Sequence, residues 1–224
     1  MKTIDICAVR TDKKTRKSWI CPSGVLGTVE ELAREYYLQE RQFSNCLIDS
    51  ACVYGGLSWV LFHDILFHDN LDSKQPLCSQ FLNTPNRFYD KHKTTIEQRL
   101  VEYSDDPQGV FDEKMNHFCI HPFFCDPKSK IDKYHGDWLM RNRSALRDFA
   151  CMSIEYDQAS LIREIMIKSY KGRSKGWPDL VVWSSSTILF AEVKSTDKLS
   201  KEQILWIEEH ENQFPIELVQ ITKK

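Results

Sequence analysis

Three ionisable residues stand at the ends of two strongly apolar runs between residues 175 and 195. Asp179 directly follows a proline, and Glu192 and Lys194 are separated by a single valine. Charged side chains at the ends of buried strands are costly to desolvate unless an opposite charge lies beside them. The charges of these three residues therefore need compensation, either by one another or by a bound cation.

The two apolar runs predict a β-hairpin that brings the three residues together. Leu180–Trp183 and Ile188–Ala191 are rich in β-branched and aromatic residues, and the Ser-Ser-Ser-Thr sequence between them predicts a turn. Counting outward from the middle of that turn places Asp179 opposite Glu192, with their Cβ atoms about 5 Å apart. Lys194 lies on the same face as Glu192, because side chains alternate along a strand.

Two carboxylates this close together favour a metal ion. They repel each other, and each raises the pKa of the other unless a cation lies between them. A hard divalent ion such as Mg²⁺ or Mn²⁺ suits oxygen ligands of this kind. Lys194 could then orient a water nucleophile or offset the charge that grows on a phosphorane. The alternative is an ion pair that closes an exposed hairpin, which stabilises a fold by less than about 1 kcal/mol.

Three short motifs in this part of the chain resemble the VRR-NUC branch of the PD-(D/E)XK nuclease superfamily. They are, in order, GWPDLVVW, AEVKS and LSKEQILWI. Each motif alone is weak, but the three together are specific as a set. The resemblance implies an α/β fold with a restriction-endonuclease-like core, in which helices flank a mixed sheet. It also implies a DNA nuclease that depends on Mg²⁺ or Mn²⁺.

The resemblance assigns roles to individual residues. It implies that Asp179 and Glu192 bind the metal, with Val193 also among the ligands, and that Lys194 and Gln203 complete the catalytic set. Gln203 has a second explanation, because the Ser-Lys-Glu-Gln sequence that it ends is a helix capping box.

One metal ligand of the family lacks an obvious counterpart. The family places a further Glu near the start of the helix that ends in an HDILF-like sequence, whereas this chain reads Leu-Ile-Asp-Ser-Ala at residues 47–51. Asp49 could take the role with a shorter side chain, or Ser50 could stand there and leave a gap in the coordination. Glu164, in a later helix, is a further candidate. We select Asp49 as the third ligand and expect weaker metal binding.

A basic segment before the hairpin predicts contacts with DNA phosphates, which give affinity without sequence information. The net charge of −2 argues against a protein that coats nucleic acid by bulk charge, so any such contact must be local. A solvated helix end is the alternative. Trp177 could stack on a base, with core packing as the alternative. The expected phosphate-binding residues are Lys168, Lys171, Arg173 and Lys175.

The rest of the chain predicts helices. Their expected ranges are 28–40, 52–67 with an interruption at Gly55-Gly56, 94–103, 137–149 and 157–170. VEELAREYY, LSWVLFHDILF and TIEQRL among them resemble segments of the Fanconi-associated nuclease family. We therefore expect a mostly helical part over residues 1–150, which carries the upstream acidic ligand, and a nuclease core over residues 151–224.

The resemblance implies 5′-flap endonuclease and 5′-to-3′ exonuclease activity in DNA interstrand crosslink repair, in the nucleus and with repair proteins as partners. Two alternatives stay open: a non-catalytic DNA-binding module with a degenerate site, and a dimeric four-way-junction resolvase. The oligomeric state is open as well.

The chain lacks the sequence signals of a secreted or membrane protein. Its eight cysteines show no paired framework, and no apolar run approaches a membrane span. We expect a soluble intracellular protein without a membrane partner. The HFCIHPFFC segment offers zinc-type ligands, but their spacing departs from the usual pairs, which favours ordinary buried cysteines.

Overall fold

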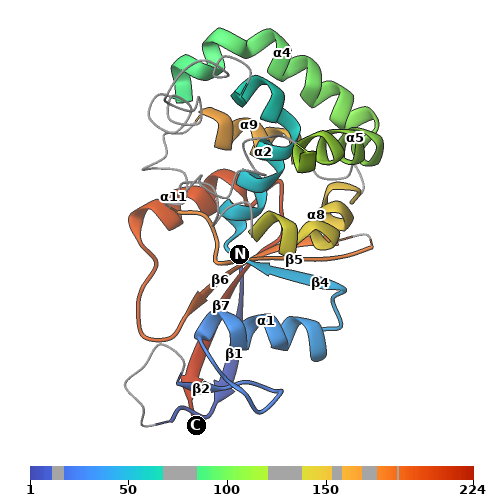
Figure 1. The fold of residues 1–224 in the computed structure, drawn as a ribbon. Helices are drawn as coiled ribbons and strands as arrows, with labels where there is room; N and C mark the ends of the chain where they lie inside the picture. The colour runs from blue at the N-terminus through green and yellow to red at the C-terminus, as the bar shows by residue number, and fades with distance from the viewer. Residues whose placement is uncertain (12–17, 68–84, 121–137, 153–157, 168–175, 186) are drawn as a thin grey trace. The chain divides into compact units, whose positions relative to one another are not determined.

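The computed structural model describes residues 1–11, 18–67, 85–120, 138–152, 158–167, 176–185 and 187–224, and Figure 1 shows their elements. The chain divides into two compact units. One joins Met1–Ala51 to Lys175–Lys224, and the other is Cys52–Ser174. The sequence-based division after residue 150 coincides with neither edge, because strands near the two chain ends pair with each other. Such long-range pairing leaves no local periodicity to detect.

A mixed five-stranded sheet forms the centre of the first unit, and a mixed sheet is what the resemblance to the nuclease family implies. The strand order is β1-β7-β6-β5-β4, with antiparallel pairing among β4, β5 and β6 and parallel pairing among β6, β7 and β1. The strands are β1 Lys2–Ala8, β4 Asn45–Ile48, β5 Leu180–Ser184, β6 Thr187–Lys194 and β7 Ile216–Lys223. A separate two-stranded sheet pairs β2 Trp19–Ile20 with β3 Leu26–Gly27. The first 50 residues thus hold four strands besides their predicted helix.

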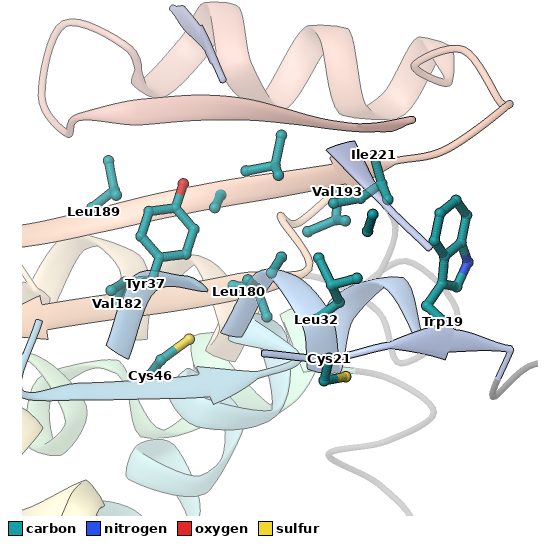
Figure 2. Close-up of a cluster of buried hydrophobic side chains, with 14 residues drawn as sticks. Trp19, Cys21, Leu32, Tyr37, Cys46, Leu180, Val182, Leu189, Val193 and Ile221 are labelled. Atoms are coloured by element: carbon teal, nitrogen blue, oxygen red, sulfur yellow. The ribbon is translucent and has the colours of Figure 1, made fainter. Parts of the chain in front are cut away.

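One face of the five-stranded sheet is covered by α1 (Val29–Gln39), whose capping box joins Thr28 and Glu31 as the sequence predicts. Leu32 and Tyr37 of α1 belong to one buried apolar cluster with side chains of β5 and β6, which Figure 2 shows. The strand residues of this cluster in β5 and β6 are Leu180, Val182, Leu189, Ala191 and Val193.

The opposite face of the sheet packs against α11 (Lys201–His210). Because side chains alternate along a strand, Phe190, Glu192 and Lys194 of β6 face away from α1. Phe190 lies edge-on to Trp206 of α11, with ring centroids 5.3 Å apart. The ionisable residues of β6 therefore lie on the face that α11 covers.

The second unit consists of helices. They are most of α2 (Ser50–Phe67), α4 (Pro85–Asp105), α5 (Pro107–Ile120), α8 (Arg143–Ala150) and α9 (Gln158–Ile167). The predicted interruption at Gly55-Gly56 is wrong, since α2 runs through both glycines. A Cβ on Gly56 would lie 2.8 Å from Cδ2 of Leu139, so this glycine permits close packing.

The described part of the chain bears on the expectations about membrane spans and cysteines. Among the described residues, no helix is both long and apolar enough to cross a bilayer. Five cysteines of the described part are reduced and form no disulfide: Cys7, Cys21, Cys46, Cys52 and Cys151. The cysteine side chains of HFCIHPFFC lie outside the described part, so its zinc-site alternative is not tested.

Candidate active site

The β5–β6 hairpin has the predicted register. Leu180 pairs with Ala191 and Ser184 with Thr187, which places position 179 opposite position 192. β5 begins at Leu180, directly after the Pro178-Asp179 step. There the carboxylate of Asp179 serves as the acceptor in place of a main-chain carbonyl, since its Oδ2 accepts a hydrogen bond of 2.9 Å from the backbone N–H of Val193. The sequence of the hairpin thus fixes Asp179 at the strand end.

Glu192 is fully buried, and its two carboxylate oxygens differ in their surroundings. Oε1 lies 2.5 Å from Nζ of Lys194 and also accepts a hydrogen bond from Nε2 of Gln203. Oε2 is buried and accepts no hydrogen bond from any residue that the structure describes. A buried acceptor without a donor costs on the order of 1–3 kcal/mol, and either a proton shared with the neighbouring carboxyl of Asp179 or a bound cation would offset this cost.

The two carboxyl groups of the hairpin perturb each other. Burial raises the pKa of Glu192 to about 7, and the charge of Asp179 adds to the shift, while Lys194 opposes it. Burial also raises the pKa of Asp179, against the hydrogen bond from Val193 and the charge of Lys194. One lysine does not compensate both carboxylates. A divalent cation would, because it favours the ionised form of both groups.

Gln203 completes the predicted capping box and also contacts the buried carboxylate, while its catalytic role stays a prediction. Its Oε1 accepts a hydrogen bond of 2.8 Å from the N–H of Ser200, and the Ser200 hydroxyl accepts one of 3.2 Å from the N–H of Gln203. The other end of the same amide donates to Glu192. A carboxylate could complete the capping box but could not donate to Glu192. Gln203 therefore joins the start of α11 to the buried carboxylate.

The main chain of Asp49 contacts the main chain of Asp179. Its N–H donates a hydrogen bond of 2.6 Å to the carbonyl of Asp179, and its φ of 69° is in the left-handed region. The hydroxyl of Ser50 donates a hydrogen bond of 2.5 Å to the carbonyl of Pro178. In the described part of the chain, no three His, Cys, Asp or Glu side chains form a group suited to hold a metal. The Asp49 carboxylate as third ligand stays a prediction.

Trp177 is only 4% exposed, and its ring centroid lies 5.3 Å from that of Trp206 in α11. This arrangement favours core packing over base stacking. The four basic residues expected to contact phosphates lie outside the described residues, so their prediction is not tested. Glu164 belongs to α9 of the second unit.

The residues of the hairpin fit a hard divalent ion. Asp179 and Glu192 offer carboxylate oxygens, and the buried Oε2 of Glu192 has no other described partner. Val193 has no side-chain ligand atom, so it could contribute only its main-chain carbonyl. Oxygen donors of this kind are those that Mg²⁺ and Mn²⁺ prefer.

Comparisons with known proteins show which sequences and folds the chain resembles. Residues 139–221 match the model of the VRR-NUC domain. The chain is 26% identical over 190 residues to a Fanconi-associated nuclease 1 homolog of Caenorhabditis elegans, covering 80% of this chain and 21% of that protein. It is 29% identical over 204 residues to the homolog of Schizosaccharomyces pombe, covering 88% of this chain and 27% of that protein. The chain thus spans about a fifth to a quarter of the length of these relatives, and its sequence is similar to that part of them.

The fold also matches solved structures. The crystal structure of paFAN1 bound to DNA with a one-nucleotide 5′ flap and a gap superposes with a TM-score of 0.66. The match covers 100% of this chain and 38% of that chain, at 14% sequence identity. A second structure, with a two-nucleotide flap, gives a TM-score of 0.60 at 13% identity. At this identity the similarity establishes the fold.

Proposed function

We propose that this chain, in which residues 139–221 match the VRR-NUC domain, is a structure-selective DNA nuclease that hydrolyses phosphodiester bonds with the help of Mg²⁺ or Mn²⁺. One observation supports this most strongly: the buried Oε2 of Glu192, which has no described hydrogen-bond donor and lies in a site shared with Asp179. The proposal includes 5′-flap endonuclease and 5′-to-3′ exonuclease action in crosslink repair, in the nucleus and beside other repair proteins. The relatives' names and the flap DNA of the similar structures support the choice of substrate.

Each residue of the site has a proposed part. Asp179 and Glu192 would hold the ion, with Val193 through its carbonyl and Asp49 as the third carboxylate. When bound, the ion would neutralise charge on the scissile phosphate and lower the pKa of a water molecule. Lys194, paired with Glu192, would position that water and offset the charge that develops on the phosphorus centre.

Two further groups would act around the reacting atoms. The amide of Gln203 would hold Glu192 in its orientation, because it is itself fixed by the capping box at the start of α11. The basic segment would bind the neighbouring phosphates, which gives affinity for the backbone without reading the sequence. Its proposed members are Lys168, Lys171, Arg173 and Lys175.

The second candidate is a DNA-binding module whose nuclease site is degenerate. It is favoured by one finding: the described residues contain no group of three acidic, His or Cys side chains arranged for a metal. Calorimetric titration of the metal-free chain with MnCl₂ separates the two candidates. A nuclease should bind Mn²⁺ at millimolar concentration or below and lose that binding in Glu192→Gln, whereas a degenerate module should show no binding that depends on this residue.

The nuclease proposal is tested by cleavage of labelled 5′-flap and nicked duplexes with Mn²⁺. We expect the wild-type chain to cut near the flap junction, and we expect Asp179→Ala and Lys194→Ala each to lower the rate by at least about 100-fold, as loss of charge stabilisation at the reacting atoms does. Asp197→Ala, which removes an exposed carboxylate from the loop after β6, is the control and should cleave at the wild-type rate. Equal cleavage by all four proteins would refute the assigned site.

A further inference from the structure

Asp179 and the residue before it accept three hydrogen bonds, and two of them come from residues 49 and 50. Its carboxylate accepts from the N–H of Val193. Its own carbonyl accepts from the N–H of Asp49, at 2.6 Å. The carbonyl of the preceding residue, Pro178, accepts from the hydroxyl of Ser50, at 2.5 Å. The segment before α2 therefore contacts two consecutive carbonyl groups around the candidate metal ligand.

These two contacts fix the direction of the Asp179 side chain. A peptide group is planar, so a hydrogen bond to its carbonyl orients the whole group. The carbonyls of Pro178 and Asp179 belong to the two peptide planes that flank the Cα of Asp179. When both planes are fixed, φ and ψ of this residue are fixed, and with them the direction of its Cα–Cβ bond. A carboxylate that binds a metal must be held to within a fraction of an ångström.

The two donors are themselves held firmly. Ser50 is 0% exposed and is the first residue of α2, so water does not compete for its hydroxyl. Asp49 follows β4, whose last residue Ile48 pairs with Leu180 at the start of β5. The left-handed φ of Asp49 turns the chain from strand to helix at this point, and Asp tolerates that region better than most residues do.

We propose that Ser50 is a positioning residue of the metal site and acts through Asp179. Its hydroxyl holds the Pro178-Asp179 peptide group, and thereby aims the carboxylate that binds the ion. This inference rests on the proposed function, because it supposes that Asp179 is a ligand. It also gives Asp49 a part in the site through its main-chain N–H, separate from any part of its carboxylate.

Ser58 provides a matched control. It also lies in α2, is also 0% exposed, and also donates its hydroxyl to a backbone carbonyl, that of Tyr54, at 2.8 Å. Ser50→Ala and Ser58→Ala therefore each remove one buried hydroxyl and leave one carbonyl without that donor. We expect Ser58→Ala to lose no more stability than Ser50→Ala, because the carbonyl of Tyr54 is also the acceptor for the helical N–H of Ser58. Stability is measured as the shift of the urea midpoint of the full chain.

Metal binding separates the two variants. Calorimetric titration with MnCl₂ alone should show binding about tenfold weaker in Ser50→Ala than in wild type, as is typical when a residue that orients a ligand is lost. Ser58→Ala should bind Mn²⁺ as wild type does. Ser50→Thr keeps a hydroxyl at the same position and should restore most of the affinity. Flap cleavage should show the same order, with the loss in Ser50→Ala reduced at high Mn²⁺ concentration.

The outcomes distinguish this inference from the proposed function. If Ser50→Ala and Ser58→Ala bind Mn²⁺ equally well, while binding still depends on Asp179, the positioning role is wrong and the nuclease site stands. If the wild-type chain neither binds Mn²⁺ nor cleaves DNA, the proposed function is wrong and the inference falls with it. Weaker Mn²⁺ binding in Ser50→Ala, together with nearly wild-type binding in Ser50→Thr, supports the positioning role.

Discussion

At the scale of single residues, the site is defined by one buried carboxylate with unequal oxygens. Oε1 of Glu192 is bound by Lys194 and Gln203, whereas Oε2 has no donor among the described residues. Asp179 adds a second negative charge nearby, which contributes to the raised pKa of Glu192. In the absence of a cation, this arrangement costs free energy when both groups are ionised.

The raised pKa predicts how the stability of the metal-free chain depends on pH. In the unfolded chain Glu192 loses its proton near pH 4.5, whereas in the folded chain it holds the proton up to about pH 7. Between these values the folded state binds more protons, so the free energy of unfolding falls as the pH rises. A shift of this size corresponds to a fall of about 3 kcal/mol between pH 4.5 and pH 7.

The measurement is urea denaturation of the chain in EDTA at pH 5 and pH 8. Glu192→Gln removes the titrating group, so its free energy of unfolding should fall much less between pH 5 and pH 8 than that of the wild-type chain. Glu209→Gln, at an exposed position of α11, is the matched control and should behave as the wild type does. A variant of Glu192 with the full wild-type fall would show that other groups govern the pH dependence.

At the scale of elements, the start of α11 and the end of the loop before β5 are packed together. Gly176 has a φ of 85°, and a Cβ built on it would overlap the main-chain carbonyl oxygen of Glu202 in α11. The next residue, Trp177, packs on Trp206 of the same helix. This close approach places the capping box, and with it Gln203, beside Glu192. A glycine is needed at position 176 for two reasons, its backbone conformation and its lack of a side chain.

The substitution Gly176→Ala separates these two reasons when it is compared with Gly24→Ala. Gly24 has nearly the same φ, 82°, but nothing lies within 4 Å of the position that its Cβ would occupy. We expect Gly24→Ala to cost about 1 kcal/mol of unfolding free energy from backbone strain alone. Gly176→Ala should cost at least about 1 kcal/mol more, because α11 must move, and it should also weaken Mn²⁺ binding.

Urea denaturation and calorimetry with MnCl₂ measure the two effects. If both variants lose the same unfolding free energy, α11 accommodates the added methyl group without a loss of stability. The position of α11 then does not depend on the absence of a side chain at residue 176.

At the scale of the whole molecule, the net charge of −2 limits how the chain can bind DNA. Any phosphate contacts must come from a local basic segment, for which residues 168–175 are the strongest sequence candidate, with four basic residues and no acidic one. Each phosphate contact releases counterions and lowers the slope of log K against log salt by about 0.9.

The salt dependence of binding to a flap duplex tests this segment. Measured with Ca²⁺ in place of Mn²⁺, Arg173→Ala combined with Lys175→Ala should make the slope shallower by about 2, in proportion to the two lost contacts. Lys223→Ala combined with Lys224→Ala, at the C-terminus, removes the same charge and should leave the slope unchanged. Equal slopes in the two double variants would remove the segment from the DNA interface.

Local sequence patterns determined the elements that carry the chemistry. The β-branched runs around the Ser-Ser-Ser-Thr turn predicted the hairpin and its register, and with them the pairing of Asp179 with Glu192, because a strand period of two and a fixed turn leave few alternatives. The capping boxes of α1 and α11 were predicted for a similar reason, since each depends on residues three apart. The mixed sheet followed from the resemblance of three motifs to the VRR-NUC family.

Tertiary structure alone decided which distant segments meet at that hairpin. β1 and β4 join the sheet from the first 50 residues, and residues 49 and 50 donate to the carbonyls of Asp179 and Pro178 across about 130 positions of sequence. The unbroken course of α2 through Gly55-Gly56 and the burial of Trp177 were decided in the same way. Hydrogen bonds and packing between residues far apart in the chain have no period and no fixed spacing, so no local pattern encodes them.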